Sequence, residues 1–192
     1  IVNGLVGSEM CIRDSSQSAL LQRDGDVVDV DGTSTLSFST SADDYYVAIK
    51  HRNHLGIMSS TAIALSGSVT TVDFTDANNQ ITHGSDAQTT TGMPTGVVAM
   101  WAGDVNGDGI MQYTGGNADI PAILTYTLND GGNFLNTPTW TVNGYSAFDV
   151  DMNGASQYTG ASPDSPILLQ NALAHPGNFL NTATWSINAQ LP

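Results

Sequence analysis

Residues 104–143, DVNGDGIMQYTGGNADIPAILTYTLNDGGNFLNTPTWTVN, decide the fold of this chain because a closely related sequence follows them after a spacer of five residues. Residues 149–188 read DVDMNGASQYTGASPDSPILLQNALAHPGNFLNTATWSIN, and the two segments align without a gap at a constant offset of 45 residues. Both copies keep Gln-Tyr-Thr-Gly, Asn-Phe-Leu-Asn-Thr and a tryptophan at matched positions. The C-terminal half is therefore a tandem duplication.

Each copy opens with the pattern D-x-[DN]-x-[DN]-G, in which side-chain oxygens at positions 1, 3 and 5 converge on calcium and the glycine permits a sharp turn. The acid and the amide at positions 3 and 5 are exchanged between the copies, so the charge facing an ion is preserved. We therefore predict two Ca²⁺ sites. The ligands expected from positions 1, 3 and 5, from the position 7 backbone carbonyl and from the position 9 side chain are Asp104, Asn106, Asp108, Ile110 and Gln112 in the first loop, and Asp149, Asp151, Asn153, Ala155 and Gln157 in the second.

The acid usual at position 12 is replaced by Gly115 and Gly160, and Asp119 and Asp164 follow four residues later. Each of these aspartates precedes an apolar run, IPAIL or SPILL, so helices are expected over 119–129 and 164–174. The two aspartates either close a lengthened loop as direct ligands or serve as ordinary helix N-caps, and one carboxylate can do both. The alternative for the loops themselves is a pair of Asp/Asn/Gly-rich turns without an ion.

The charge of the chain restricts its partners. The formal net charge is −14, and residues 53–192 contain neither Lys nor Arg. Such a chain cannot neutralise phosphates, which argues against nucleic acid and anionic membranes as partners. No apolar run reaches eighteen residues, so no membrane insertion is expected. A bound cation would relieve the repulsion among the aspartates.

Residues 18–101 consist of short β-branched or alternating runs separated by Gly, Asp, Asn and Ser. The strands expected there, about seven, suggest a β-sandwich, with a long surface loop over 75–95. Residues 51–54, His-Arg-Asn-His, are expected to be surface polar residues at a strand end, with Arg52 paired to one of Asp24, Asp26, Asp29 or Asp31. The expected strands cover 18–25, 26–32, 35–40, 45–51, 61–66, 69–75 and 96–102.

The loop-then-helix pair resembles dockerin modules, which are duplicated calcium loops that are each followed by a helix. It is more similar still to repeats at the ends of surface and secreted proteins of gram-negative environmental bacteria, which show GDVNGDG, then QYTG, then an Asp before P-I-L. The likeness covers residues 97–192 and implies calcium-stabilised, extracellular, non-catalytic modules. ALLQRDGDVVDVDG and YYVAIKHRNHLG in turn resemble the strand-rich domain that precedes such repeats. That domain starts upstream of residue 18 in those proteins, which implies that this copy lacks its first strand or strands.

The N-terminal segment, residues 1–17, differs from the rest of the chain. GLVGSEMCIRDS, residues 4–15, holds the only cysteine, Cys11, and the only glutamate, Glu9. It resembles the translation of a sequencing-library adapter. The alternative is a real extended strand at this position, which completes the sandwich of its own chain or of a neighbour. The expected organisation is thus mainly β, with a β-sandwich over 18–101 followed by the duplicated calcium-loop and short-helix module over 102–192.

The sequence carries no nucleophile elbow, HExxH motif or phosphate loop, so we expect no enzyme. Two readings remain. The first is an extracellular structural protein, a protomer of a bacterial surface fibre whose partners are copies of itself joined by β-strand complementation. The alternative is a cell-surface anchoring or carbohydrate-binding module. Glycans are a further expected partner, through O-glycosylation of the Thr/Ser-rich surface.

Overall fold

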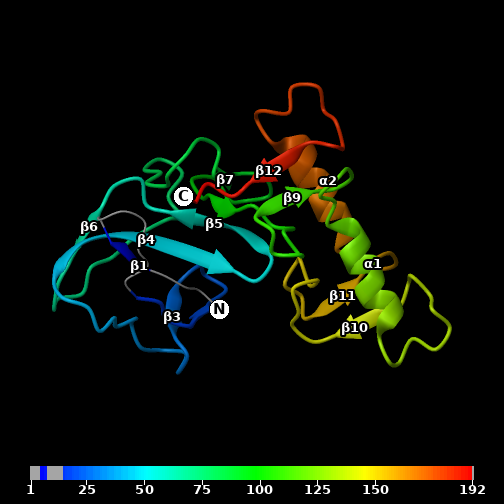
Figure 1. The fold of residues 1–192 in the computed structure, drawn as a ribbon, viewed down its shortest axis with the longest axis horizontal. Coiled ribbons are helices and arrows are strands. Elements are labelled where there is room, and N and C mark those ends of the chain that lie inside the picture. Colours follow the sequence, from blue (N-terminus) through cyan, green and yellow to red (C-terminus); the bar gives the residue numbers. More distant parts are fainter. Residues whose placement is uncertain (1–4, 8–14, 192) are drawn as a thin grey trace. The chain divides into compact units, whose positions relative to one another are not determined.

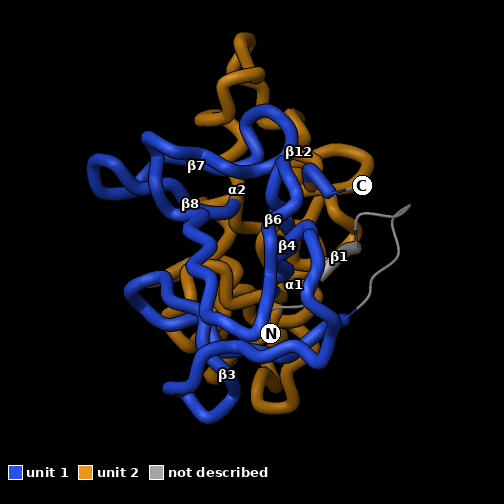
Figure 2. Tube along the Cα trace, turned by 90° about the vertical axis from the view of Figure 1, so that its left-hand side faces the viewer, with its two compact units in different colours: residues 1–51, 56–100, 190–192 blue, residues 52–55, 101–189 orange. Residues whose placement is uncertain are grey.

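The computed structural model describes residues 5–7 and 15–191, and Cys11 and Glu9 lie outside the described residues. The chain divides into two compact units, shown in two colours in Figure 2. Unit 1 comprises Ile1–His51, Gly56–Met100 and Gln190–Pro192, and unit 2 comprises Arg52–Leu55 and Trp101–Ala189. The architecture is mainly β, with small antiparallel sheets and two short helices, as the sequence predicted at that level.

Unit 1 is built around one nine-residue strand, β4 (Asp43–His51) (Figure 1). β1 (Leu5–Gly7) and β6 (Ile63–Leu65) both pair with it antiparallel, and Tyr45 is the partner of both Gly7 and Ile63. Because a strand residue pairs across two edges, β1 and β6 lie on opposite edges of β4. The sheet also contains β5 (His54–Met58).

Two further antiparallel pairs complete the strands that are assigned to unit 1. One joins β2 (Ala19–Leu21) to β3 (Val27–Asp29), and the other joins β7 (Gln88–Thr89) to β8 (Ala99–Met100). The predicted strands over 35–40 and 69–75 are wrong, because neither segment is assigned as a strand. Burial still alternates along the second segment, because Val72 is partly buried and Phe74 is buried while their neighbours are exposed. The alternating pattern therefore predicts which side chains are buried, but it does not provide a partner strand for hydrogen bonds.

Unit 2 holds the duplicated segments. In the first, β9 (Ile110–Gln112) leads to α1 (Ile120–Asn129) and then β10 (Thr141–Asn143). In the second, β11 (Ala155–Gln157) leads to α2 (Ser165–Ala174) and then β12 (Ser186–Asn188). The expected helices are confirmed to within one residue. Each has a proline in its first turn, where the missing N–H costs no hydrogen bond.

The strands of the two copies pair reciprocally rather than within one copy. β9 pairs with β12 and β10 pairs with β11, both antiparallel, with Gln112 opposite Ser186 and Gln157 opposite Thr141. The second register is the first with the copies exchanged. The two copies therefore share their small sheets, and neither completes a sheet alone.

Matched residues of both copies form the core of unit 2. Ile123 from α1 and Leu168 from α2 are fully buried and pack with Met111 and Trp101. The buried faces of the helices are not purely apolar, because Leu173 is exposed while Thr127 and Asn171 are buried. Both polar side chains are satisfied: the Thr127 hydroxyl donates to the Ile123 carbonyl, and the Asn171 amide donates to the Ala102 carbonyl. The buried cluster is Leu55, Trp101, Val105, Met111, Ile123, Val150, Leu168 and Ile187.

Candidate metal centre

The first loop is a tight turn wrapped around the carboxylate of Asp104. Its Oδ1 accepts the N–H of Gly107 at 2.9 Å and its Oδ2 accepts the N–H of Gly109 at 3.1 Å. Both glycines have positive φ, 74° and 83°, which explains why glycine stands at these positions. Asn106 and Asp108 extend this turn, and the Asn106 amide donates to Asp108 Oδ2 at 3.1 Å.

The second loop repeats this arrangement with acid and amide exchanged. The Asn153 amide now donates to Asp151 Oδ2 at 2.7 Å, so the same pair of positions is joined in the opposite direction. Asp149 Oδ2 accepts the N–H of Gly154 at 3.2 Å. Met152, the counterpart of Gly107, adopts φ 56°, a left-handed conformation that costs a residue with a side chain about 1–2 kcal/mol.

Asp119 and Asp164 occupy the N-cap positions of α1 and α2, yet neither side chain caps its helix. Both carboxylates turn back into the preceding loop and are fully buried. Asp119 accepts the N–H groups of Val105 and Gln112 at 3.0 and 2.9 Å. Asp164 accepts those of Val150 and Gln157 at 2.6 and 2.8 Å. Each aspartate therefore closes the loop that precedes its helix.

Burial makes these closing carboxylates hard to ionise when no cation is present. Loss of hydration raises the pKa of Asp119 to about 7 and that of Asp164 to about 6, against the opposing effect of their backbone N–H donors. Burial also raises the pKa of Asp104 and of Asp149. Such groups ionise more readily when a cation lies beside them.

In the second loop three carboxylates converge closely enough to share one ion. Ligand atoms of Asp149, Asp151 and Asp164 all lie within 4.8 Å of one another. Asp149 Oδ1 is buried and finds no hydrogen-bond donor within the described part of the chain. A buried carboxylate oxygen without a donor is costly, and a metal ion would satisfy it. The donor set is all oxygen, which suits calcium rather than zinc or copper.

The first loop carries Asp104, Asn106 and Asp119 at the positions of this triad. An amide oxygen replaces one carboxylate there, and amide oxygens are also ordinary calcium ligands. Ile110 and Ala155, whose backbone carbonyls were expected to bind, are the first residues of β9 and β11.

The glutamine side chains expected to bind the ion from position 9 form hydrogen bonds with backbone groups of the chain instead. Gln112 Oε1 accepts the N–H of Asn117 and its Nε2 donates to the Thr184 carbonyl. Gln157 likewise accepts from the N–H of Ser162 and donates to the Thr139 carbonyl. We therefore leave both side chains out of the ligand set proposed below.

Two residues that flank the second loop come from elsewhere in the chain and were not expected there. Arg52 pairs with Asp149, at 3.5 Å between Nη2 and Oδ2, and the expected pairing with an aspartate of the 24–31 segment is wrong. Asn53, expected on the surface, is fully buried and donates to the Asp149 carbonyl at 2.7 Å. A contact between residues about a hundred positions apart has no local sequence signal. The scarcity of basic residues is the one feature that distinguishes Arg52.

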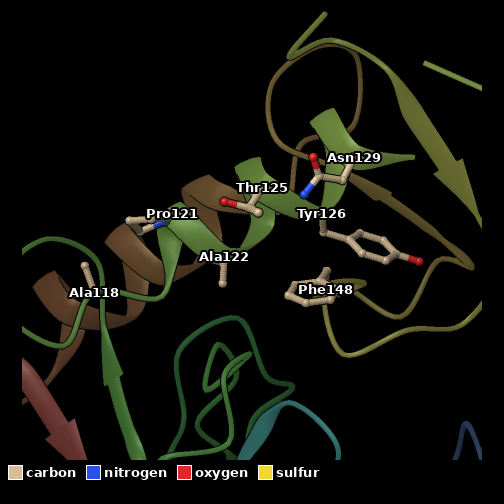
Figure 3. A pocket seen from close by; sticks show the side chains of 7 residues that line it. All are labelled: Ala118, Pro121, Ala122, Thr125, Tyr126, Asn129 and Phe148. Carbon is tan, nitrogen blue, oxygen red and sulfur yellow. The ribbon is translucent and has the colours of Figure 1, made fainter. Parts of the chain in front are cut away.

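Unit 2 also has a shallow apolar depression beside α1 (Figure 3). Tyr126 and Phe148, which both line it, stack against each other with ring centroids 4.3 Å apart. Its lining supplies no carboxylate, imidazole, amine or thiol: Ala118, Pro121, Ala122, Thr125, Tyr126, Asn129 and Phe148.

Comparisons of the chain with protein-family models, with curated proteins and with solved structures each found no match. No helix within residues 15–191 is long and apolar enough to cross a membrane.

Proposed function

We propose that this chain is a non-catalytic, extracellular structural protein whose duplicated loops each bind one Ca²⁺ and so hold unit 2 together. The observation that carries the proposal is the second loop, where three carboxylates converge and the buried Asp149 Oδ1 has no hydrogen-bond donor among residues 5–7 and 15–191. In the ligand set that we propose, Asp149, Asp151, Asn153, Asp164 and the Ala155 carbonyl hold one ion. Asp104, Asn106, Asp108, Asp119 and the Ile110 carbonyl hold the other.

Calcium would supply positive charge where the fold concentrates carboxylates. Asp119 and Asp164 are anchored to loop N–H groups, so they present their oxygens in fixed positions. Occupation of a loop would tie the start of each copy to the start of its helix. Calorimetric titration should give two ions per chain, and the melting temperature should fall in EDTA. An unchanged melting temperature in EDTA would remove the calcium proposal.

For the assembly of the protein, we propose that the chain is a protomer of a bacterial surface fibre that grows by β-strand complementation. In support, β1 covers one edge of β4 with only three residue pairs, and it comes from the N-terminal end of the chain. A strand so briefly paired can be exchanged for the same strand of a neighbour, and repetition builds a filament. The sandwich that would contain this edge remains part of the proposal.

Negative-stain imaging of the concentrated protein, with calcium and with EDTA, tests the fibre. Filaments in calcium that shorten or vanish when residues 1–17 are deleted support strand complementation. Particles that stay monomeric and monodisperse in calcium at high concentration refute it, while calorimetry decides the calcium proposal separately.

One observation favours the alternative, a cell-surface anchoring module. Phe134, Leu135, Phe179 and Leu180 are each at least 85% exposed. The two loops that carry them lie at opposite ends of unit 2 (Figures 1 and 2). Paired exposed hydrophobic residues at matched positions are typical of docking to another protein. Retention on a polysaccharide column would instead favour a carbohydrate-binding module.

A further inference from the structure

The two loops differ by one positive charge, which lies beside the second. Arg52 is the only Lys or Arg in the sequence of unit 2. Its guanidinium is 3.5 Å from Asp149 Oδ2. In the first loop the equivalent carboxylate, that of Asp104, is held by the backbone N–H groups of Gly107 and Gly109. The matched loops thus place their first ligands in different electrostatic surroundings.

Arg52 is held in place by several contacts. Its Nε donates to the Ser146 carbonyl at 2.7 Å, and the guanidinium carbon lies 5.6 Å from the centroid of the Tyr145 ring. The side-chain amide of the neighbouring Asn53 donates to the Asp149 carbonyl, and the Asn53 backbone carbonyl accepts the N–H of Gly103. The arginine side chain is 30% exposed and the aspartate side chain is fully buried. An ion pair with these restraints is unlike an exposed pair, whose contribution is commonly negligible.

We propose that Arg52 is an internal counter-ion that makes the two calcium loops unequal, an inference that rests on the calcium binding proposed above. The second loop keeps its folded shape without calcium, because Arg52 partly neutralises Asp149, and binds the ion more weakly. The first loop has three carboxylates, Asp104, Asp108 and Asp119, with no arginine of the described residues paired to them, and it binds calcium more tightly. A fixed positive charge within a few ångströms of a divalent ion opposes its binding, and the interaction is weakly screened where water is excluded.

The effect can be measured one loop at a time. Asp108 and Asp151 are exposed, so Asp108→Ala and Asp151→Ala each disable one loop with little effect on the core. Calorimetry on Asp108→Ala then reports the second loop, and calorimetry on Asp151→Ala reports the first. We expect the second loop to bind at least about tenfold more weakly, a difference of about 1.4 kcal/mol.

Adding Arg52→Gln to each background tests the cause. It should tighten the second loop by about tenfold and leave the first loop unchanged, and it should lower the melting temperature in EDTA because Asp149 loses its counter-ion. Arg23→Gln is the matched control, since it removes the same charge from an exposed position in unit 1. It should change neither affinity.

Equal affinities of the two loops, or an Arg52→Gln variant that binds calcium at the second loop no more tightly, would overturn the inference while leaving calcium binding intact. If the parent protein binds no calcium, the proposed function itself fails. If Arg52→Gln folds only when calcium is added, the inference is supported, because the second loop has become calcium-dependent. Should it not fold at all, Arg52→Lys decides: it keeps the charge and must keep the weak second site, and tighter binding in that variant contradicts the proposal.

Discussion

Replacing Asp119 with asparagine gives the sharpest test of how the first loop is closed. The carboxylate is fully buried and accepts backbone N–H groups on both oxygens, from Val105 and Asn106 on one and from Gln112 on the other. Asparagine has nearly the same shape but only one acceptor oxygen and no charge. In EDTA one backbone N–H would then face an amide NH₂, at a cost of about 1–3 kcal/mol.

The diagnostic quantity is the gain in stability on adding calcium rather than the stability itself. If the first loop binds with a dissociation constant near 10⁻⁴ M, 10 mM calcium stabilises the folded state by about 2.7 kcal/mol through that loop, and a second loop that binds tenfold more weakly adds about 1.4 kcal/mol. For a chain of this size the contribution of the first loop corresponds to a rise in Tm of about 5–11 °C. Asp119→Asn should remove the contribution of the first loop, leaving that of the second.

Thermal melts with EDTA and with 10 mM calcium measure this gain. Asp164→Asn should remove the other loop's share, whereas the exposed β4 variant Asp43→Asn should retain the full gain. A variant Asp119→Asn that gains as much from calcium as the parent protein would refute the assignment of Asp119 as a ligand. The burial of Asp119 would then be explained by its hydrogen bonds to the loop N–H groups alone.

Three further predictions follow from the same geometry. Because the folded-state pKa values of Asp119 and Asp164 lie at about 7 and 6, above the ordinary 3.8, their contribution to the stability of the calcium-free protein is complete below pH 4 and is lost as pH rises through these values. The Tm in EDTA should therefore fall between pH 4.5 and pH 7.5, and calcium affinity should rise over the same range; a Tm in EDTA that rises instead would contradict the burial argument. Met152→Gly should stabilise the protein by about 0.5–1 kcal/mol in denaturant titrations because it relieves a left-handed residue, whereas Gly107→Ala, at the matched position, should destabilise it. Replacing Phe134 and Leu135 with serine should leave Tm unchanged, since both are exposed, and should reduce self-association or partner capture if the loop is a docking surface.

The sequence allowed much of unit 2 to be predicted because its signals are local. The helices follow from an aspartate, a proline and an apolar run, and the turns follow from the glycines of D-x-[DN]-x-[DN]-G. The closing role of Asp119 could also be anticipated, although not its fully buried hydrogen bonds to the loop. Arg52 could not be paired correctly, since several aspartates lay nearer to it in sequence.

The strands of unit 1 were harder, because a strand requires a partner that the pattern does not name. Residues 35–40 alternate in exposure as a strand would, yet they enter no ladder. The strand predicted over 45–51 does form, as β4, because strands pair with it on both edges. The pairing of β9 with β12 could likewise not be predicted, because periodicity indicates which segments are extended but not which strands pair.

That reciprocal pairing would couple the two proposed calcium sites. β9 leads directly out of the first loop, and its ladder partner β12 belongs to the second copy; β11 leads out of the second loop and pairs with β10 of the first. When one loop opens, a strand of the other copy loses its ladder partner. The two copies should therefore unfold in a single transition, even if their loops bind calcium with different affinities. If Arg52 holds the second loop in shape at low calcium, it also keeps β11 in place as the partner of β10. The first copy would then retain half of its sheet before its own loop binds an ion.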